Sequence, residues 1–419
     1  MRIADITEFY APTGGVRNHL TMKGRVLRDQ GHDHLVIAPG KQHSLGPLDH
    51  AVTEAKGSAR VVQVKGPTLP YDSNYQLLWR LDRVHRALLD FDPEVLSINS
   101  LYMATLALET LPRRLSPLRT IFWHADFIDT YLRPRIPSGV SKRVADALVE
   151  PLWAAVRKVA NRSAATFVAS KSQAQKLREH RVERVIFVPF GLDRSVFRSD
   201  RSSSAVRSEL LGSNPNARLL VGVGRLAGEK RWDCVIYAVQ RLRATEEVRL
   251  VIFGEGPELE RLRAIADPRV VSLFGPERDR NRLAVVMASA DLFVHGGAYE
   301  TYGFSVAEAM ASGLPVVVPS SGAVMDLIDP SSSETFAPGS AEACTAALKR
   351  VLGPEFNRYR ACALAAAERV PDSKAQILEL VRIYRALRDE ARPRAVNWDA
   401  FGRQGGDRSA TLKGASPAV

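Results

Sequence analysis

Short apolar runs recur along the first half of the chain, and they alternate with longer segments whose apolar residues follow a helical spacing. Runs with the length of strands lie at 2–7, 34–39, 60–64, 94–98, 119–123, 165–170 and 184–189. Segments with a helical pattern lie between several of them, notably at 74–90, 141–161 and 171–180. Short apolar strands that alternate with helices are typical of a parallel sheet covered by helices on both faces.

A polar stretch at 200–215, rich in Ser and Asn, interrupts this pattern, and the alternation then starts again. Further strand-like runs lie at 218–224, 249–254, 269–275, 291–295 and 315–319. Helical patterns dominate from 340 to about 390. The sequence therefore predicts an α/β protein with two doubly wound, Rossmann-like domains in series.

We place the first domain at 1–198 and the second at 199–374. A helix predicted at 375–390 follows the second domain, and we expect it to cross back to the first. The last stretch, 391–419, is rich in Gly, Ser, Arg and Pro, a composition that predicts a disordered tail.

Composition is that of a soluble globular protein, with 45% hydrophobic and 25% charged residues. No window approaches the roughly 18 uninterrupted apolar residues of a membrane-spanning helix. The first residues, MRIADITEFYAPTGG, lack the basic start and apolar run of a secretory signal. The three cysteines are widely spaced and form no CxxC pair, so we expect reduced thiols and a cytoplasmic location.

The chain is strongly basic, and basic proteins are drawn to nucleic acid, anionic membranes or anionic small molecules. The net charge is +12, and between 113 and 162 ten Lys and Arg residues face only four acidic ones. Two interpretations stay open: a solvated basic surface without a partner, and peripheral contact with anionic lipid on the inner face of the membrane. Nucleic acid is not expected as a partner, because no DNA- or RNA-binding motif accompanies the charge.

The segment richest in candidate chemistry is 291–322, DLFVHGGAYETYGFSVAEAMASGLPVVVPSSG. A predicted strand ends in a loop at 295–299, and a helix follows from about Phe304. Glu300 lies in the loop and Glu308 about one turn into the helix, at the edge of an open α/β sheet where ligands bind.

Two carboxylates at this edge suit the vicinal hydroxyls of a ribose and of a sugar. The alternative, that Glu308 only complements the helix dipole, stays open on this spacing alone. The start of the predicted helix also offers backbone N–H groups that suit a phosphate or a hydroxyl-rich ring. These donor-binding candidates are Thr301, Tyr302, Gly303 and Phe304.

The E-x7-E arrangement, with Y-G-F after the first Glu and EAMASGLPVVV around the second, resembles the retaining glycosyltransferases of family 4. Further motifs fit this resemblance in order, over roughly residues 2–328. They are Gly14-Gly15, VPFGLD at 188–193, GVGRLAGEK at 222–230 and FGEGPELERL at 253–262. The resemblance implies the GT-B fold, in which two facing Rossmann-like domains hold the donor in a cleft between them.

The resemblance assigns Arg225 and Lys230 to the diphosphate of a nucleotide sugar. The leaving diphosphate gains negative charge, and without a divalent metal that charge needs fixed cations where it develops. A guanidinium grips phosphate with two hydrogen bonds, whereas an ammonium acts as a point charge. We therefore expect no metal ion and no cofactor besides the nucleotide-sugar substrate. Glu300 would hold sugar hydroxyls and Glu308 the ribose.

The resemblance also marks residues of the first domain. Gly14 and Gly15 would let the backbone approach the donor diphosphate, and His124, at the end of the predicted strand TIFWH, would contact the donor sugar near the reacting carbon. Asp126, two residues on, is a guess for the acceptor pocket. The chain departs from the family at 97–100, where SINS replaces a His-rich strand end, and at Asp326, where relatives often have Glu.

Other signatures point away from different chemistry. Asp90 and Asp92 form a D-x-D, the metal signature of another glycosyltransferase fold, but their place between a helix and Pro93 favours a turn. The phosphate-binding loop G-x-x-x-x-G-K-[ST] is missing, which disfavours ATP hydrolysis, and the dinucleotide fingerprint G-x-G-x-x-G is missing as well.

We predict a retaining glycosyltransferase that moves a hexose to a lipid-linked or glycoside acceptor and forms an α-glycosidic bond. The N-terminal region most resembles α-mannosyltransferases and glycolipid glycosyltransferases, which favours GDP-mannose over a UDP-sugar as donor. Two alternatives stay open. One is a related enzyme with a soluble acceptor, such as a disaccharide synthase or a nucleotide-sugar 2-epimerase. The other is a non-catalytic protein that binds an anionic surface.

Overall fold

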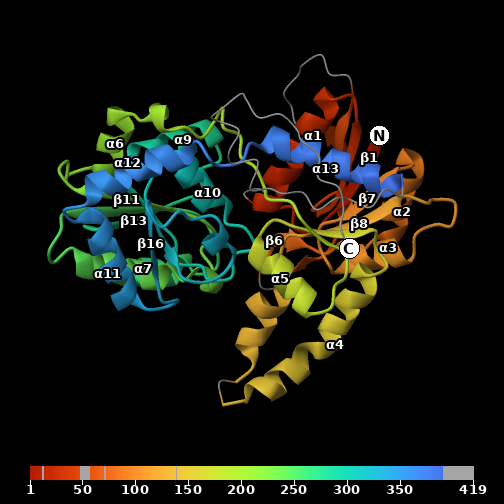
Figure 1. The fold of residues 1–419 in the computed structure, drawn as a ribbon, viewed down its shortest axis with the longest axis horizontal. Helices are drawn as coiled ribbons and strands as arrows, with labels where there is room; N and C mark the ends of the chain where they lie inside the picture. The colour runs from red at the N-terminus through yellow and green to blue at the C-terminus, as the bar shows by residue number, and fades with distance from the viewer. Residues whose placement is uncertain (12–13, 48–56, 70–71, 138, 390–419) are drawn as a thin grey trace, which may run out of the picture.

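The computed structural model describes residues 1–11, 14–47, 57–69, 72–137 and 139–389. They form two α/β domains that lie side by side (Figure 1). Each contains one large, mainly parallel sheet, so the predicted architecture of two doubly wound domains is confirmed. The tail predicted at 391–419 lies outside the described residues.

The N-terminal domain is built on an eight-stranded sheet with the order β10-β9-β8-β7-β1-β2-β4-β3. All neighbours run parallel except β3, which pairs antiparallel with β4. The strands are β1 Arg2–Ile6, β2 Asp33–Gly40, β3 Ser44–Pro47, β4 Ala59–Lys65, β7 Val95–Ile98, β8 Leu118–Trp123, β9 Ala165–Val168 and β10 Val185–Phe187. In a separate two-stranded sheet, β5 Thr68–Leu69 pairs antiparallel with β6 Asp72–Gln76.

The helices of this domain cover the sheet because each buries one apolar face. They are α1 Gly15–Asp29, α2 Leu81–Phe91, α3 Met103–Glu109, α4 Lys142–Ala160 and α5 Lys171–Glu179, with short turns η1 Ile128–Leu132 and η2 Arg133–Arg135. The helix predicted at 74–90 was wrong at its start, because the chain up to Gln76 is strand β6. Local apolar spacing does not register the pairing of β6 with β5.

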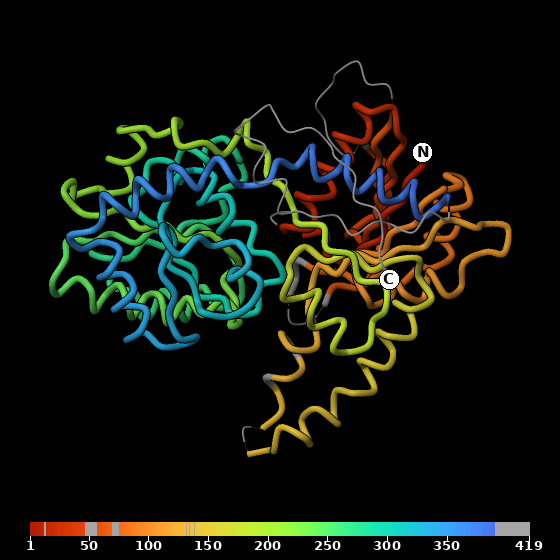
Figure 2. The backbone as a smooth tube through the Cα atoms, viewed as in Figure 1, coloured from red at the N-terminus to blue at the C-terminus, as the bar shows by residue number. Residues whose placement is uncertain are grey.

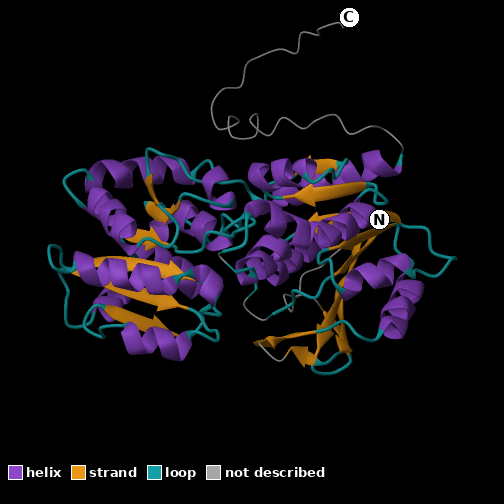
Figure 3. Cartoon of the chain, turned by 90° about the horizontal axis from the view of Figure 1, so that it is seen from below, coloured by secondary structure: helices purple, strands orange, loops and turns teal. Residues whose placement is uncertain are grey.

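The C-terminal domain has a six-stranded parallel sheet with the order β13-β12-β11-β14-β15-β16. The strands are β11 Arg218–Val223, β12 Val248–Phe253, β13 Val271–Phe274, β14 Leu292–Val294, β15 Val316–Pro319 and β16 Ser333–Phe336. Helices lie on both sides of the strands (Figure 3), as continuous apolar strands require. They are α6 Ser204–Leu211, α7 Trp232–Leu242, α8 Leu259–Ile265, α9 Arg280–Ser289, α10 Phe304–Ala311, α11 Ala341–Leu352 and α12 Phe356–Ala367, with turns η3 Ser199–Arg201, η4 Gly228–Lys230 and η5 Ala323–Asp326.

The chain crosses between the domains twice, and the two crossings lie against each other. The Leu192 N–H donates to the Pro371 carbonyl (2.8 Å), and the Ser373 N–H donates to the Leu192 carbonyl (2.9 Å). A Cβ on Gly191 would lie 2.3 Å from the Asp372 backbone, so only glycine fits this approach. The sequence motif VPFGLD at 188–193 thus forms one half of a two-stranded connection.

The last helix, α13 Ser373–Arg388, returns to the N-terminal domain, and the blue tube of Figure 2 shows the crossing. The Tyr384 ring packs edge-on against Phe167 of β9 with 5.6 Å between centroids. Its hydroxyl accepts a hydrogen bond from Lys23 of α1 (3.4 Å). The helix therefore fastens the second domain to the core of the first.

In each sheet the chain reverses its direction of winding beside the first strand. In the N-terminal sheet β1 has β2 on one side and β7 on the other, and in the C-terminal sheet β11 has β12 and β14 as neighbours. Such switch points leave a crevice at the carboxyl ends of the two strands, where ligands bind in open α/β sheets. The two switch points therefore locate the site.

Candidate active site

Three side chains meet at the switch point of the C-terminal domain. Lys230 and Glu300 were predicted from the sequence, and His295 was not. Lys230 ends the turn η4 after β11, and its ammonium donates a hydrogen bond to Glu300 Oε1. His295 directly follows β14, and its Nε2 lies 2.9 Å from the same oxygen. Sequence analysis missed His295, although its place directly after a buried strand is a usable signal.

Glu300 is held in its ionised form by these neighbours. Burial raises the pKa of the Glu300 carboxyl, but Lys230 and His295 outweigh this effect, so its pKa lies well below the ordinary value. A carboxylate of this kind keeps its full capacity to accept hydrogen bonds. The arrangement places a negative acceptor and a positive ammonium side by side at the sheet edge.

Two glycines permit the close packing around Lys230. A Cβ on Gly296 would lie 2.6 Å from the Lys230 carbonyl oxygen, and one on Gly297 would lie 2.8 Å from His295 Nε2. Any larger residue would push the loop away from η4. The HGG sequence that follows β14 is therefore explained by the approach of two loops at the switch point.

Arg225 lies two residues beyond β11, in the same connection as Lys230. Its guanidinium donates to Glu229 and lies 5.9 Å from the centre of the Tyr75 ring, which belongs to β6 of the other domain. The Trp232 indole N–H donates to the Arg225 carbonyl (2.9 Å) and fixes the local backbone. Arg225 therefore stands at the boundary between the domains.

Glu308 is buried in α10, where it accepts a 2.8 Å hydrogen bond from Arg280 Nη2. The Arg280 guanidinium also lies over the Phe197 ring, 4.8 Å from its centre. The first turn of α10 carries no acidic residue, so the alternative in which Glu308 only complements the helix dipole is not favoured. Sequence analysis missed Arg280, which lies on α9 and gives no local signal.

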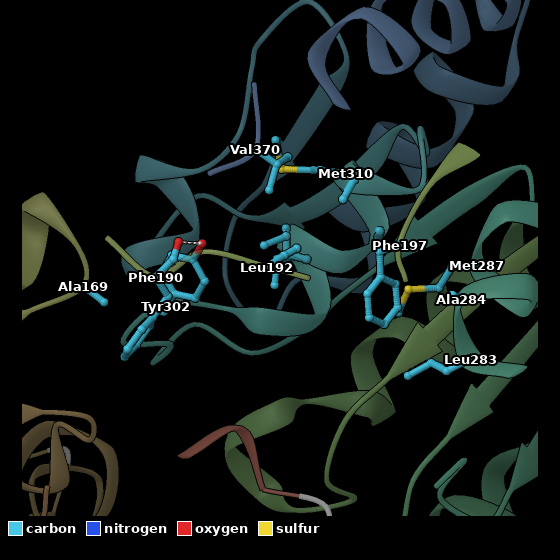
Figure 4. Close-up of a cluster of buried hydrophobic side chains, with 14 of the residues drawn as sticks. Ala169, Phe190, Leu192, Phe197, Leu283, Ala284, Met287, Tyr302, Met310 and Val370 are labelled. Atoms are coloured by element: carbon cyan, nitrogen blue, oxygen red, sulfur yellow. Dashed lines mark hydrogen bonds between the residues drawn. The ribbon is translucent and has the colours of Figure 1, made fainter. Parts of the chain in front are cut away.

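The residues between the two glutamates tie the domains together. The Thr301 hydroxyl donates to the His124 carbonyl (2.6 Å), and the Tyr302 hydroxyl donates to the Phe190 carbonyl (2.7 Å; Figure 4). Gly303 adopts the left-handed conformation (φ 95°) just before α10. This linking role of the Thr301 and Tyr302 side chains was not predicted, and their donor-binding role stays a prediction.

Phe304 makes the third of these connections. Its ring stacks on Phe190 with 4.9 Å between centroids and 29° between planes. A Cβ on Gly15 would lie 2.9 Å from the Phe304 ring, so this glycine lets the start of α1 meet the start of α10. Gly14 precedes α1 as its N-cap residue. The predicted contact of both glycines with a diphosphate stays a prediction.

His124 follows β8 and is buried among aromatic rings. It stacks on Phe122 with 4.6 Å between centroids and on Phe190 with 5.3 Å. Burial lowers the pKa of its imidazole to about 3, so the ring is neutral at physiological pH. Its orientation is set by a 2.8 Å hydrogen bond between Nε2 and Asn99 Oδ1.

A buried chain of hydrogen bonds extends from His124 to the core of the domain. Asn99 donates through Nδ2 to Asp5 Oδ1 (2.9 Å), so its oxygen faces His124 and His124 Nε2 carries the proton. Asp5 is fully buried and pairs with the Lys23 ammonium (2.7 Å) and with His34 Nε2 (2.6 Å). These hydrogen bonds hold Asn99 in place, and Asn99 in turn orients the His124 ring. Sequence analysis did not identify this network.

Asp126 is engaged in an ion pair. Its carboxylate accepts from Lys176 of α5, which also contacts Asp129. The prediction that Asp126 lines an acceptor pocket stays a prediction. Asp326, the departure from the family pattern, accepts a 2.9 Å hydrogen bond from the Ser172 N–H at the start of α5 and so links the domains.

The D-x-D motif, Asp90 to Asp92, lies at the C-terminal end of α2. Asp92 follows α2 in the left-handed conformation (φ 48°), and its carboxylate accepts a 2.8 Å hydrogen bond from Arg2. This agrees with the turn that the sequence favoured.

Glu8 lies at the switch point of the N-terminal domain and was missed by sequence analysis. It follows β1, accepts hydrogen bonds from the Ser100 hydroxyl and the Ala104 N–H (2.7 Å to Oε1), and is buried. Burial raises the pKa of the Glu8 carboxyl to about 7, although both hydrogen bonds oppose this effect. Glu8 is therefore a buried carboxyl group just beyond the carboxyl end of β1.

Comparison with known proteins agrees with this geometry. Residues 13–196 match the family described as Glycosyltransferase Family 4, and residues 207–369 match the one described as Glycosyl transferases group 1. A GDP-mannose-dependent alpha-mannosyltransferase of Mycolicibacterium smegmatis is 31% identical over 335 residues, which cover 79% of this chain and 82% of that protein. A GDP-mannose-dependent alpha-(1-6)-phosphatidylinositol dimannoside mannosyltransferase of Mycobacterium tuberculosis is 28% identical over 373 residues, or 88% of this chain and 92% of that protein.

Solved structures share the fold. Sucrose-phosphate synthase from Thermosynechococcus elongatus superposes with a TM-score of 0.74 at 17% identity, over 93% of this chain and 100% of that one. Anabaena Alr3699/HepE in complex with UDP and glucose gives 0.71 at 17% identity, over 92% and 100%. The fold and the site together define a glycosyltransferase of the GT-B class. Within that class, the chain belongs to family 4.

Proposed function

We propose that this glycosyltransferase transfers mannose from GDP-mannose to a lipid-linked acceptor with retention, forming an α-glycosidic bond. The observation that carries the proposal is the meeting of Lys230, Glu300 and His295 at the switch point of the second domain. The choice of donor is supported by the relatives named as GDP-mannose-dependent mannosyltransferases.

In this proposal the donor diphosphate is bound by Arg225 and Lys230. Their cations stabilise the charge that develops on the leaving group, which would require no metal ion or other cofactor. Glu300 accepts hydrogen bonds from hydroxyls of the transferred sugar, and Glu308 accepts them from the ribose. Arg280, which holds Glu308 in place, limits its rotamers and so orients it.

The reaction is proposed to occur on one face of the sugar. The acceptor oxygen bonds to the anomeric carbon as the bond from that carbon to the phosphate oxygen breaks, and the acceptor proton passes to the leaving phosphate. His124, kept neutral by burial, contacts the sugar from the other domain. The links at Thr301 and Tyr302 hold the two halves of the site together and help to exclude water.

A lipid-linked acceptor is supported by the mycobacterial relative whose name specifies a phosphatidylinositol dimannoside. The net charge of +12 suits an anionic membrane surface, so we place the protein peripherally on the inner face of the membrane. Among the helices of the described residues, none is both long and apolar enough to cross a bilayer.

Calorimetric titration of the protein with GDP, UDP and ADP, first in EDTA and then in Mg²⁺, tests the donor assignment. GDP should bind at least tenfold more tightly than UDP or ADP, and replacing EDTA with Mg²⁺ should change its affinity less than twofold. Tighter binding of UDP would favour a UDP-sugar donor, the second candidate, which the UDP complexes of structural neighbours allow. Binding that requires Mg²⁺ would overturn the metal-independent mechanism.

A further inference from the structure

Helix α4, Lys142–Ala160, has two apolar faces, but only one of them packs against the domain. The packed face is buried and includes Trp153, which stacks on Trp123 with 5.9 Å between centroids. The other buried residues of the helix are Val149, Val156, Val159 and Ala160.

The opposite face of α4 is an exposed apolar stripe. Its residues are spaced by three or four positions, so they align along one side of the helix. Val144, Leu148 and Leu152 are 52%, 60% and 37% exposed. The complete stripe is Val144, Ala147, Leu148, Pro151, Leu152 and Ala155, all exposed. Exposed leucines that occur singly need no explanation, whereas a continuous stripe on one helix indicates a partner.

The position of α4 makes the stripe accessible. The helix extends away from the N-terminal sheet at the lower edge of Figure 1, on the side away from α13. In chain order, β8 and His124 are followed by the turns η1 and η2 and then by α4. Contact at α4 would therefore orient the acceptor side of the enzyme.

The surroundings of the stripe are basic. The two acidic side chains of α4 are already engaged: Asp146 accepts from Arg133 and Glu150 from Arg157, both at 2.7 Å. Exposed Lys142, Arg143 and Lys158 lie on the same helix. Over 133–162 seven Lys and Arg residues accompany two acidic ones, so the region carries a strong positive charge.

We propose that the stripe of α4 inserts into the surface of an anionic phospholipid bilayer, with the flanking basic side chains on the lipid head groups. An apolar stripe bordered by Lys and Arg is the pattern of helices that lie in the plane of a membrane surface. The inference rests on the proposed lipid-linked acceptor and names the surface that would bring the enzyme to it.

A second copy of the chain fits the stripe less well. Pairing of two equal faces would bring the same basic residues together, and like charges across an interface oppose association. Anionic lipid instead complements Lys142, Arg143 and Lys158. The charge around the stripe therefore selects the bilayer over a homodimer.

Sedimentation with vesicles tests the proposal. Wild-type protein should bind phosphatidylglycerol/phosphatidylcholine vesicles at least tenfold more tightly than vesicles of phosphatidylcholine alone, and added salt should weaken this binding. The double substitution Leu148→Ser/Leu152→Ser should weaken binding at least tenfold. The matched control Leu45→Ser/Leu378→Ser removes leucines that are 66% and 38% exposed elsewhere and should change it less than twofold.

Two further readouts separate the possible results. The α4 variant must keep its melting temperature and its affinity for GDP, which shows that the fold and donor site are intact. Failure of wild-type GDP binding with vesicle binding retained would overturn the proposed function and leave the surface standing. Unchanged vesicle binding by the α4 variant, or dimerisation in analytical ultracentrifugation that this variant abolishes, would overturn the bilayer proposal.

Discussion

The Thr301 hydroxyl donates a 2.6 Å hydrogen bond to the backbone carbonyl of His124, across the boundary between the two domains. Thr301 follows Glu300 in the chain, and His124 ends the strand segment that approaches from the other sheet. This hydrogen bond therefore connects the chain neighbour of Glu300 to His124, and both Glu300 and His124 are candidate catalytic residues.

Thr301→Val removes the donor while keeping the shape of the side chain. We expect kcat for sugar transfer to fall about tenfold, because misplacement of reacting groups by a fraction of an ångström is costly. The affinity for GDP should stay within twofold of wild type, because the substitution removes only the side-chain hydrogen bond to His124 and leaves the backbone N–H of Thr301 in place. Thr301→Ser restores the hydroxyl and should recover most of the rate. A valine variant with wild-type kcat would show that the hydrogen bond between Thr301 and His124 does not contribute to the rate.

Lys230→Met should lower kcat at least a hundredfold, because the leaving diphosphate would lose a cation that contacts it. Steady-state kinetics at saturating donor measure this effect. Arg241→Met is a suitable control, since Arg241 of α7 forms an exposed ion pair with Glu342 of α11. A kcat close to wild type for the Lys230 variant would show that Lys230 does not stabilise the leaving diphosphate.

The same variant should also lose stability in a pH-dependent way. Lys230 helps to keep the pKa of Glu300 below its ordinary value, so the pair stabilises the fold above the unfolded pKa near 4.5 and loses this effect as the pH falls. Urea unfolding should show a loss of roughly 2 kcal/mol at pH 7 that shrinks below pH 4.5. A loss of unfolding free energy that is equal at pH 7 and below pH 4.5 would contradict the pairing of Lys230 with Glu300.

Glu8→Gln tests the raised pKa of Glu8. The folded state holds the Glu8 proton up to about pH 7, whereas the unfolded chain releases it near 4.5, so wild-type stability falls as the pH rises between these values. The amide cannot ionise, and the variant should gain about 1–3 kcal/mol over wild type between pH 5 and pH 8. A difference in unfolding free energy between the two proteins that stays constant from pH 5 to pH 8 would refute the raised pKa of Glu8.

Gly15→Ala should disturb the packing of the domains, because its Cβ would lie 2.9 Å from the Phe304 ring. Overpacking of this kind costs about 1–3 kcal/mol. Gly139→Ala is the matched control, since its Cβ would have nothing within 4 Å. Combining Gly15→Ala with Phe304→Leu should recover part of the loss measured by thermal unfolding. Additive losses in the double variant would show that the two residues act independently.

The sequence predicted the architecture because buried parallel strands are continuous apolar runs. The run at 94–98 became β7, and the run at 315–319 became β15. The start of α2 was wrong because β6 depends on pairing with β5, a partner that local spacing does not reveal. Prediction succeeded where one segment determines its own structure.

For the site, the sequence located the loop with Glu300 and the turn with Lys230 because both follow strands at one sheet edge. It missed Arg280, the partner of Glu308, because the two are 28 residues apart on different helices. It also missed the support of His124 by Asn99 and Asp5, which three strands bring together. Partners fixed by tertiary packing require the structure.

The proposed reaction is tested most directly by transfer of radiolabelled mannose from GDP-mannose to a bacterial polar lipid extract, measured in EDTA for wild type and Lys230→Met. We expect wild type to form a mannosylated lipid that α-mannosidase cleaves, and the variant to form at least a hundredfold less. Absence of labelled lipid with wild-type protein, or equal labelling by both proteins, would contradict the proposed mannosyl transfer.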